Sequence, residues 1–452
     1  MKLLGLDIGT TTICGLVLDS EDGRVVSVNT QSNPAGLPAR EPWEMLQDAD
    51  AALTVARRIV EDTLETHHDI EAVGVAGQMH GILYIDSAGK AVSPLYTWED
   101  GRGDRPFEGG SYASFLSAVI GRPVSTGMGA VTHFFNTKNG IVPRNMAALC
   151  TIGDYVAMRL AGARAPVMDA TNAASLGAFD LEELSFARSA LRESGLDPSV
   201  FPEVRTDYPV IGEIRAGPRV FPAMGDNQAS FLGSVADPLR QALVNVGTGS
   251  QFSLFVPSYR EINGIDLRPL PYGGYIGVGA GLCGGRAYAA LRHFFQRTVR
   301  LIAGRDEDVP WETMNRMSPA AGAQPLAVDT RFSGTRVSPG IRGSITNIGL
   351  ANFTPEHLAS GVREGIVAEL KSFSECFDAA ERDRLATLIG SGNAIRLGEP
   401  LRRAFEAGFG VPLRTPRHRE ETSFGAALVA GVAAGGIPSR EAACSLVRYE
   451  DS

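Results

Sequence analysis

The sequence predicts an α/β fold with mixed sheets, and three observations carry this prediction. Apolar runs of strand length at residues 3–8 and 13–18 flank a turn of Gly and Thr. A second pair of runs, at 242–246 and 252–256, flanks a similar turn near the middle of the chain. Between the pairs, apolar residues recur at helical spacing, as over 48–65. Strands that alternate with helices are typical of sheets covered by helices.

The recurrence of the hairpin suggests that the chain consists of two related halves. The two Gly-Thr turns are separated by about half of the 452 residues. A repeat this long would mean a duplicated domain, since short repeats of 20 to 50 residues build solenoids instead. Gly-Thr turns are common, however, so the pattern alone is equally compatible with chance.

The remaining elements follow in order along the chain. The helix at 48–65 has an apolar face, and residues 73–85 predict another hairpin around the turn 76–81. Helices are expected at 286–301 and 401–409. The segment 305–346 is rich in Pro, Gly and Arg without periodicity, which predicts irregular structure.

Composition excludes several classes of protein. The net charge is -9 and no basic stripe is present, so we expect no nucleic-acid partner. The five cysteines are scattered and form no CxxC pair, which favours reduced thiols in the cytoplasm over disulfides or zinc. The chain opens on a strand, without the basic and apolar regions of a signal peptide. Its apolar runs are short, so we expect no membrane span.

The first hairpin tip, residues 7–12, has a composition suited to phosphate. Gly9, Thr10, Thr11 and Thr12 can point several N–H groups and hydroxyls into one concavity. Asp7 at the end of the strand could hold Mg²⁺ through water. An ordinary turn with a capping Asp explains the same residues.

Two later loops share this composition. The second tip carries Gly247, Thr248 and Gly249, and two such tips facing each other would grip a polyphosphate from both sides. A third loop, at 390–393, follows an apolar run and precedes a helix. Its glycines Gly390 and Gly392 would let the backbone approach a flat ligand, and Ser391 and Asn393 lie beside them. The same glycines could instead serve tight packing alone.

Two familiar nucleotide motifs need separate treatment. None of the four lysines lies in a GxxxxGK[ST] frame, which excludes a P-loop. Residues 279–284 form a literal GxGxxG ahead of a helix, the pattern of a dinucleotide site. The preceding run, 272–277, is too rich in Gly for a buried parallel strand, so this reading is disfavoured.

Polar residues near strand ends are candidates for chemistry. Asp226, in Gly225-Asp226-Asn227, could take a proton from a hydroxyl, although capping of a helix from Asn227 is an equal alternative. His80 beside Gln78, and the run 96–102, offer polar and aromatic contacts for a sugar.

Together these segments resemble the FGGY carbohydrate kinases over nearly the whole chain. Residues 7–11 look like the family's first phosphate motif, and 247–250 lie where its second is found. Residues 390–393 look like its adenosine motif, and 424–428 match its closing helix.

The resemblance implies two actin-like (ribonuclease H-like) domains with mixed central sheets flanked by helices, and an active site in the cleft between them. Residues 1–236 would hold the sugar, the first phosphate loop and the catalytic Asp, and residues 237–452 the second phosphate loop and the adenosine site. ATP and Mg²⁺ would be bound, the metal near Asp7 and Asp226. Asp226 matches the general base. The sugar-contact positions implied or expected nearby are Gln78, Met79, His80, Trp98, Asp100, Asp226 and Asn227.

Within the family, stretches such as 77–81, 97–102 and 171–175 resemble the sedoheptulokinases, with the xylulose kinases next. The implied reaction is the phosphorylation of sedoheptulose to its 7-phosphate. Xylulose or another ketose or polyol is the alternative substrate, and a non-catalytic sugar sensor on the same fold is the alternative of another class. An actin-like ATPase would need no cluster at residues 78–80. The sequence leaves the oligomeric state open, a homodimer included.

Overall fold

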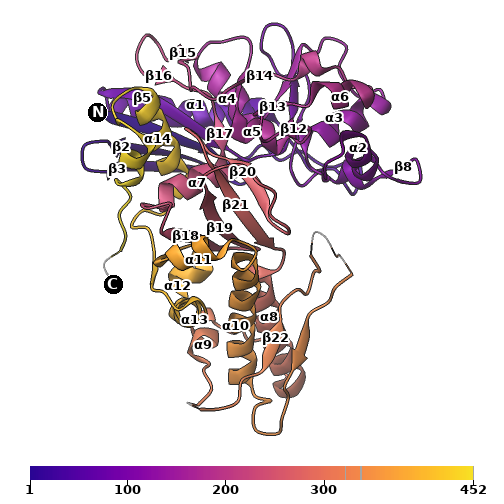
Figure 1. Cartoon of the computed structure of the whole chain (residues 1–452), viewed down its shortest axis with the longest axis vertical. Helices are drawn as coiled ribbons and strands as arrows, with labels where there is room; N and C mark the ends of the chain where they lie inside the picture. The colour runs from indigo at the N-terminus through magenta and orange to yellow at the C-terminus, as the bar shows by residue number, and fades with distance from the viewer. Residues whose placement is uncertain (321, 336–337, 339, 451–452) are drawn as a thin grey trace.

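The computed structural model describes residues 1–450 except 321, 336, 337 and 339. The chain forms two α/β domains, each built on one central sheet. In Figure 1 the first domain lies at the top and the second at the bottom, with α7 (Asp226–Ser234), β20 (Asp266–Pro269) and β21 (Tyr275–Gly281) near their junction.

The first central sheet has the order β15-β16-β5-β1-β2-β3, and β17 also pairs with β5. Strands β1 and β2 form the predicted antiparallel hairpin, and β1 pairs in parallel with β5 on its other side. The strands of this sheet are β1 (Lys2–Ile8), β2 (Thr12–Asp19), β3 (Arg24–Ser32), β5 (Ile70–Gly77), β15 (Gly212–Glu213), β16 (Arg219–Val220) and β17 (Met224–Gly225).

The second central sheet repeats this design in the order β20-β21-β19-β18-β24-β25. Here β18 and β19 form the antiparallel hairpin, and β18 pairs in parallel with β24. The order of hairpin, third strand and parallel strand is therefore the same in both halves, which confirms the duplication. Besides β20 and β21, the strands of this sheet are β18 (Gln241–Val246), β19 (Ser250–Val256), β24 (Thr387–Ser391) and β25 (Leu413–Arg414).

Most predicted elements form within two residues of their expected bounds. Helix α1 (Ala49–Thr66) begins after Asp48, whose side chain accepts the N–H groups of Asp50 and Ala51. The other helices that cover the sheets or the interdomain region are α4 (Ile152–Leu160), α5 (Ala170–Ser175), α8 (Gly284–Ala303), α9 (Trp311–Arg316), α10 (Pro355–Ser374), α12 (Asn393–Leu397), α13 (Glu399–Phe409) and α14 (Glu421–Ala433).

Shorter elements complete the fold. They are β4 (Leu46–Gln47), β6 (Leu83–Ile85), β7 (Leu95–Tyr96), β8 (Pro106–Phe107), β9 (Gly110–Ser111), β10 (Ala148–Cys150), β11 (Val167–Asp169), β12 (Phe179–Asp180), β13 (Ser185–Phe186), β14 (Glu203–Arg205), β22 (Ala327–Asp329) and β23 (Ser344–Thr346), with helices α2 (Tyr112–Ile120), α3 (Gly129–Lys138), α6 (Arg188–Glu193), α11 (Ala379–Arg384) and α15 (Arg440–Cys444) and short 3-10 helices at Gly101–Asp104 and Pro198–Val200.

The hairpin predicted at residues 73–85 is wrong. Both of its strands exist, but β5 pairs with β1, β16 and β17, whereas β6 pairs with β10. Because β5 is a central strand with neighbours on both edges, β6 has no edge to pair with. The chain turns away at His80, whose φ of 71° lies in the left-handed region.

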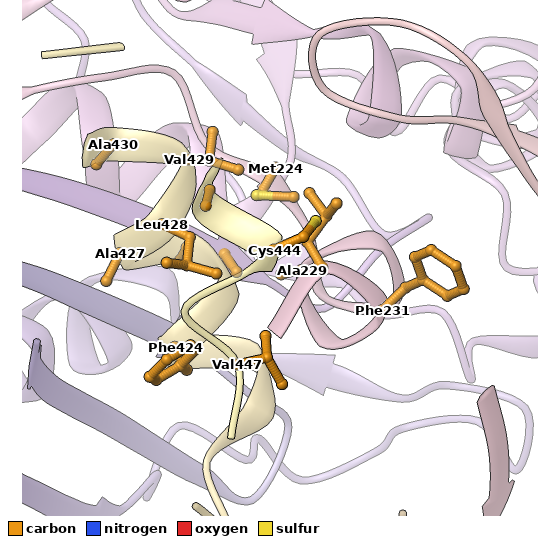
Figure 2. Close-up of a cluster of buried hydrophobic side chains, with 14 of the residues drawn as sticks. Met224, Ala229, Phe231, Phe424, Ala427, Leu428, Val429, Ala430, Cys444 and Val447 are labelled. Carbon is orange, nitrogen blue, oxygen red and sulfur yellow. The ribbon is translucent and has the colours of Figure 1, made fainter. Parts of the chain in front are cut away.

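Helix α14 belongs with the first domain, although it follows the second in sequence. It packs on β1, β5 and α7, and in Figure 1 it lies beside β5. Figure 2 shows Phe424, Leu428 and Val429 of α14 gathered with Met224 and Ala229 from the first half of the chain. A helix from the predicted second domain, 237–452, therefore packs against the central sheet of the first.

Glycines allow this close approach of α14. A Cβ on Gly425 would lie 1.9 Å from the Ala229 carbonyl oxygen of α7, and a Cβ on Gly5 would lie 1.8 Å from the Ser423 carbonyl oxygen. The backbones therefore meet at distances that only glycine permits. This contact fixes the distance of α14 from β1, the strand that carries Asp7 and ends at Ile8.

No helix among the described residues is long and apolar enough to cross a membrane. All five cysteines are free thiols, and only Cys376 is exposed.

Candidate active site between the domains

Three strands of the first sheet end side by side and bring the predicted catalytic residues together. Ile8 of β1 and Gly225 of β17 are both register partners of Gly77 in β5. Since the three strands are parallel, their carboxyl ends meet at one edge of the sheet, where ligands of open α/β sheets commonly bind. Asp7, Gln78 and Asp226 therefore lie at the same edge.

Asp226 is the first residue of α7, and Gly225 is the N-cap. The alternative that Asp226 caps a helix starting at Asn227 is therefore wrong. Burial raises the pKa of the Asp226 carboxyl to about 6, while the Asn227 N–H and the charge of Arg268 partly oppose the rise. A carboxylate with a pKa just below neutral is ionised at pH 7 and still basic enough to accept a proton.

Asp7 offers an unsatisfied carboxylate oxygen to the same space. Its Oδ1 is buried and has no hydrogen-bond partner. Burial, followed by the charges of Asp226 and Glu420, raises the pKa of Asp7 well above its usual value. A divalent cation would relieve both the unpaired oxygen and the crowding of carboxylates, so these residues fit Mg²⁺.

The protein does not form a complete metal cage around these carboxylates. Among the residues that the structure describes, no group of three or more His, Cys, Asp or Glu side chains is arranged to hold a metal ion. Mg²⁺ commonly keeps several waters and binds through one or two carboxylates together with substrate phosphates. The site therefore suits a cation that arrives with a nucleotide.

The first hairpin tip is a tight turn, since the Gly9 N–H donates to the Thr12 carbonyl oxygen over 3.0 Å. Thr11 and Thr12 are exposed. Thr10 instead bonds within the protein: its hydroxyl donates to Gln78 Oε1 at 3.3 Å and accepts from Trp98 Nε1 at 3.3 Å. Thr10 thus links the first tip to the residues expected to hold the sugar.

The second hairpin tip is braced by α8. The Gly285 N–H donates to the Gly247 carbonyl oxygen at 3.0 Å, and the Arg286 N–H donates to Thr248 at 3.1 Å. Gly247 and Thr248 remain exposed. The tip therefore presents N–H and hydroxyl groups from a fixed frame.

The glycines of the GxGxxG at 279–284 allow close packing around the second tip and on α10. A Cβ on Gly284 would lie 2.3 Å from the Gly249 carbonyl oxygen, and a Cβ on Gly279 would strike the ring of Phe373. Strand β21, which carries the first glycines, runs antiparallel to both of its neighbours. A dinucleotide site needs a parallel βαβ unit, so these glycines serve close packing.

The third loop lies against the base of the second tip. Asn245 of β18 is the register partner of Ser391 in β24, and its Nδ2 donates to Ser391 Oγ at 2.7 Å. Gly392 has a φ of 85°, and a Cβ there would lie 2.6 Å from the Val246 carbonyl oxygen. Asn393 begins α12 and is exposed. Gly392 and the exposed Asn393 thus lie close to the second tip, whereas Gly390 and Ser391 are buried beneath them.

Asn227 connects the two domains beside Asp226. Its Nδ2 donates to Gln251 Oε1 of β19 at 3.0 Å, and its Oδ1 accepts from Arg268 Nη1 of β20 at 3.0 Å. The strand that follows the second tip is therefore tied to the start of α7. This contact brings the candidate base and the second phosphate loop into one site.

A cavity of about 770 Å³ lies beside Arg268, between elements of the two domains. It is lined by Met79 and His80 from the first domain and by Asp266 and Arg268 from the second, with Gln228 of α7. Polar groups converging in a cleft of this size are typical of a small-molecule site.

Helix α5 holds both His80 and the strand before Asp226, a role that the sequence did not predict. His80 Nδ1 donates to the Ser175 carbonyl oxygen at 2.7 Å. The Gly225 N–H donates to Thr171 Oγ1 at 2.8 Å. One short helix therefore sets the relative positions of a sugar-contact candidate and the base.

Trp98 and Asp100 have different surroundings. Trp98 is 46% exposed, and with His80 it lines a neighbouring cavity of about 860 Å³. Asp100 is fully buried, and its carboxylate accepts hydrogen bonds from Arg102 Nε at 2.6 Å and from the Met45 N–H at 3.1 Å. With both oxygens engaged, Asp100 supports its loop, and the geometry does not favour the expected sugar contact.

These features define a class of protein. Two duplicated α/β domains each carry a Gly- and Thr-containing hairpin tip, and a buried carboxylate of raised pKa lies near a cavity lined by residues of both domains. Such an arrangement is that of a phosphotransferase acting on a polyhydroxylated small molecule.

Comparison with known proteins identifies the family. The N-terminal domain of the FGGY family of carbohydrate kinases matches residues 2–239, and the C-terminal domain matches residues 242–434. The chain belongs to the FGGY family of carbohydrate kinases. It is a carbohydrate kinase, and members of this family use ATP as the phosphoryl donor.

Two similar proteins with curated names are sedoheptulokinases. The Mus musculus protein is 28% identical over 94% of this chain and 96% of its own length, and the Homo sapiens protein is 28% identical with the same coverage. Among solved structures, xylulose kinase from Rhodospirillum rubrum has a TM-score of 0.83 at 19% identity, covering 100% of this chain and 93% of its own. At that identity the structural match shows the fold alone.

Proposed function

We propose that this kinase transfers the γ-phosphoryl group of ATP to sedoheptulose, giving sedoheptulose 7-phosphate. The observation that carries the proposal is the placement of Asp226, which directly follows β17 at the edge shared with β1 and β5 and precedes the interdomain residue Asn227. The sugar would occupy the cavity on one side of Asp226, and ATP would reach it from the hairpin tips on the other.

The nucleotide would lie along the surface made by the two tips and the third loop. Exposed Thr11, Thr12 and Thr248 would bond phosphate oxygens, and Gly390 to Asn393 would receive the adenosine. Mg²⁺, bound near Asp7, would supply charge neutralisation to the phosphates. The chain's own contribution is to fix the phosphates by backbone N–H groups in a site of low water content.

The proposed step is an in-line transfer. Asp226 accepts the proton of the terminal sugar hydroxyl as the oxygen forms its bond to the γ-phosphorus. The bond between that phosphorus and the bridging oxygen breaks, and ADP leaves with its electron pair. Closure of the domains would exclude water, which otherwise competes as acceptor.

Sedoheptulose is favoured over shorter sugars by two observations. The sedoheptulokinase relatives match almost end to end. His80 also lines both the cavity of about 770 Å³ and its neighbour of about 860 Å³, so the two cavities lie next to each other. A seven-carbon chain would need the larger space that the two offer together.

D-xylulose is the second candidate substrate. Met79 packs against Gly225, since a Cβ on that glycine would lie 2.8 Å from the Met79 sulfur. Met79, His80 and Asn227 thus surround the approach to Asp226, on positions resembling the sugar contacts of the xylulose kinases. A non-catalytic sensor is disfavoured, because the base and all three nucleotide loops are present.

The cysteines bear on where in the cell the enzyme works. Five free thiols suit a reducing compartment, so we place the enzyme in the cytoplasm.

The test is ADP release with Mg-ATP across sedoheptulose, D-xylulose, D-ribulose, L-ribulose and glycerol, followed by NMR of the product. The highest kcat/KM for sedoheptulose, with the phosphate on carbon 7, supports the proposal. A higher value for another sugar keeps the kinase and replaces the substrate. Binding of sugar without any turnover would identify a sensor.

A further inference from the structure

Arg268 reaches the candidate sugar site from the second domain. It lies on β20, the edge strand of the second central sheet, and is only 8% exposed. Its Nη1 donates to Asn227 Oδ1 at 3.0 Å, and its Nε donates to Asp266 Oδ2 at 2.8 Å. The guanidinium is thus held one residue away from the candidate base.

The rest of the guanidinium has donors to spare. Within the described parts of the chain, Nη2 of Arg268 makes no hydrogen bond, and it is not fully enclosed by protein although most of the side chain is buried. Arg268 also lines the cavity of about 770 Å³ that contains Met79 and His80. A donor that is held at a cavity wall without a protein partner is available to a ligand that supplies acceptors. Sugar hydroxyls are such acceptors, and a planar fork of donors fits two adjacent hydroxyls.

We infer that Arg268 is a sugar-binding residue that the second domain contributes to the site, donating through Nη2 to hydroxyls near the reacting end of the sugar. The inference rests on the proposed sugar kinase function and extends it. Because Asp226 and the first-domain contacts lie on one domain and Arg268 on the other, bound sugar would join the two domains directly. The hydrogen bond to Asn227 holds the guanidinium beside the residue that follows Asp226.

Arg268 could instead only hold the two domains together. The two roles differ in their effect on KM, because a sugar-binding residue affects the KM for sugar and not the KM for ATP. Loss of a hydrogen bond from a charged donor to bound sugar should raise the KM for the sugar by about 10- to 100-fold in Arg268→Met. The KM for ATP should change less than about threefold, since the phosphate loops do not contain Arg268. ATP hydrolysis without sugar should not change.

Arg331 provides a matched control. Like Arg268, it lies in the second domain and pairs with an aspartate two residues earlier, with Nη2 of Arg331 2.6 Å from Asp329 Oδ2. It lines neither the cavity of about 770 Å³ nor its neighbour. Arg331→Met should therefore leave the KM for sugar unchanged.

The experiment measures KM for sugar and for ATP in the full-length wild type, Arg268→Met, Arg268→Lys and Arg331→Met, with unfolding curves for each. Arg268→Lys keeps the charge, and it remains informative if the Met variant does not fold. A selective rise in sugar KM in either Arg268 variant supports the inference. Equal sugar KM in a folded Arg268 variant and the wild type overturns it, as does a parallel rise in both KM values. No turnover by the wild type with any sugar would overturn the proposed function as well.

Discussion

The acid limb of the pH–rate profile gives a direct view of Asp226. Burial raises the pKa of this carboxyl to about 6 in the free protein, from a usual value of about 3.9. A base must be ionised to act, so kcat/KM should fall as the pH drops through 6. One pH unit below the pKa only about a tenth of the sites are ionised, so kcat/KM at pH 5 should be about one-tenth of the plateau.

The assay is kcat/KM for the sugar at saturating Mg-ATP between pH 4.5 and 8. Other buried carboxyls ionise in this range, and burial raises the pKa of Asp154 to about 7. The Asp154 pKa is higher in the folded than in the unfolded chain. Its contribution to stability is therefore fully present below about pH 4 and is lost as the pH rises through 7. Asp154 thus gives no reason for activity to fall toward pH 5.

The Asp154→Asn variant is a control, because it removes one of the other buried carboxylates with a raised pKa and keeps Asp226. It should show the same acid limb near pH 6. A profile that is flat from pH 7 to 5, with folding verified by circular dichroism at each pH, would refute the reasoning. So would a limb that moves with Asp154→Asn.

Three further predictions concern packing and the loops. Gly425→Ala should lower the free energy of unfolding by about 3 kcal/mol or more, because its Cβ would meet a backbone oxygen at 1.9 Å. A Cβ at Gly431 would meet only the flexible ends of side chains, so Gly431→Ala should lower the free energy of unfolding by less. Equal urea midpoints for the two variants would contradict this. Thr171→Val should lower kcat by about tenfold while Thr171→Ser does not, since only Val loses the acceptor of the Gly225 N–H; unchanged steady-state kinetics in both would contradict it. Gly392→Ala should raise the KM for ATP and not for sugar, because φ is 85° there; a normal ATP KM would contradict this.

The sequence predicted those features that are local in the chain. The Gly-Thr tips at residues 9–12 and 247–249 are short-range turn signals between apolar strands, and both form where expected. The helix at 48–65 follows from apolar spacing and an N-cap Asp. Such signals depend on neighbours within a few residues, so a single sequence shows them.

Features set by long-range contact were not visible. Strand pairing of β5 with β1 and β17, rather than with β6, depends on which edges are already filled. Asp100 was expected at the sugar because it lies in a polar and aromatic run, yet Arg102 and Met45 turn its carboxylate inward.

Other site residues carried no signal that would single them out. Arg268 meets Asn227 across 41 positions of sequence, and Ser175 meets His80 across 95. Only the alternation of Asp266 and Arg268 on one face of a strand hints at a shared role. The predictions for the site therefore came from the resemblance to a family, and the contacts of these residues came from the fold.

The central claim is that Asp226 deprotonates a sugar hydroxyl in the interdomain cleft. Its most direct test is the rate of sedoheptulose-dependent ADP release by the wild type and by Asp226→Asn, measured at saturating sugar and Mg-ATP. We expect kcat to fall by about 10²- to 10⁴-fold in the variant, with an unchanged unfolding midpoint. Near-normal kcat in Asp226→Asn would contradict the claim.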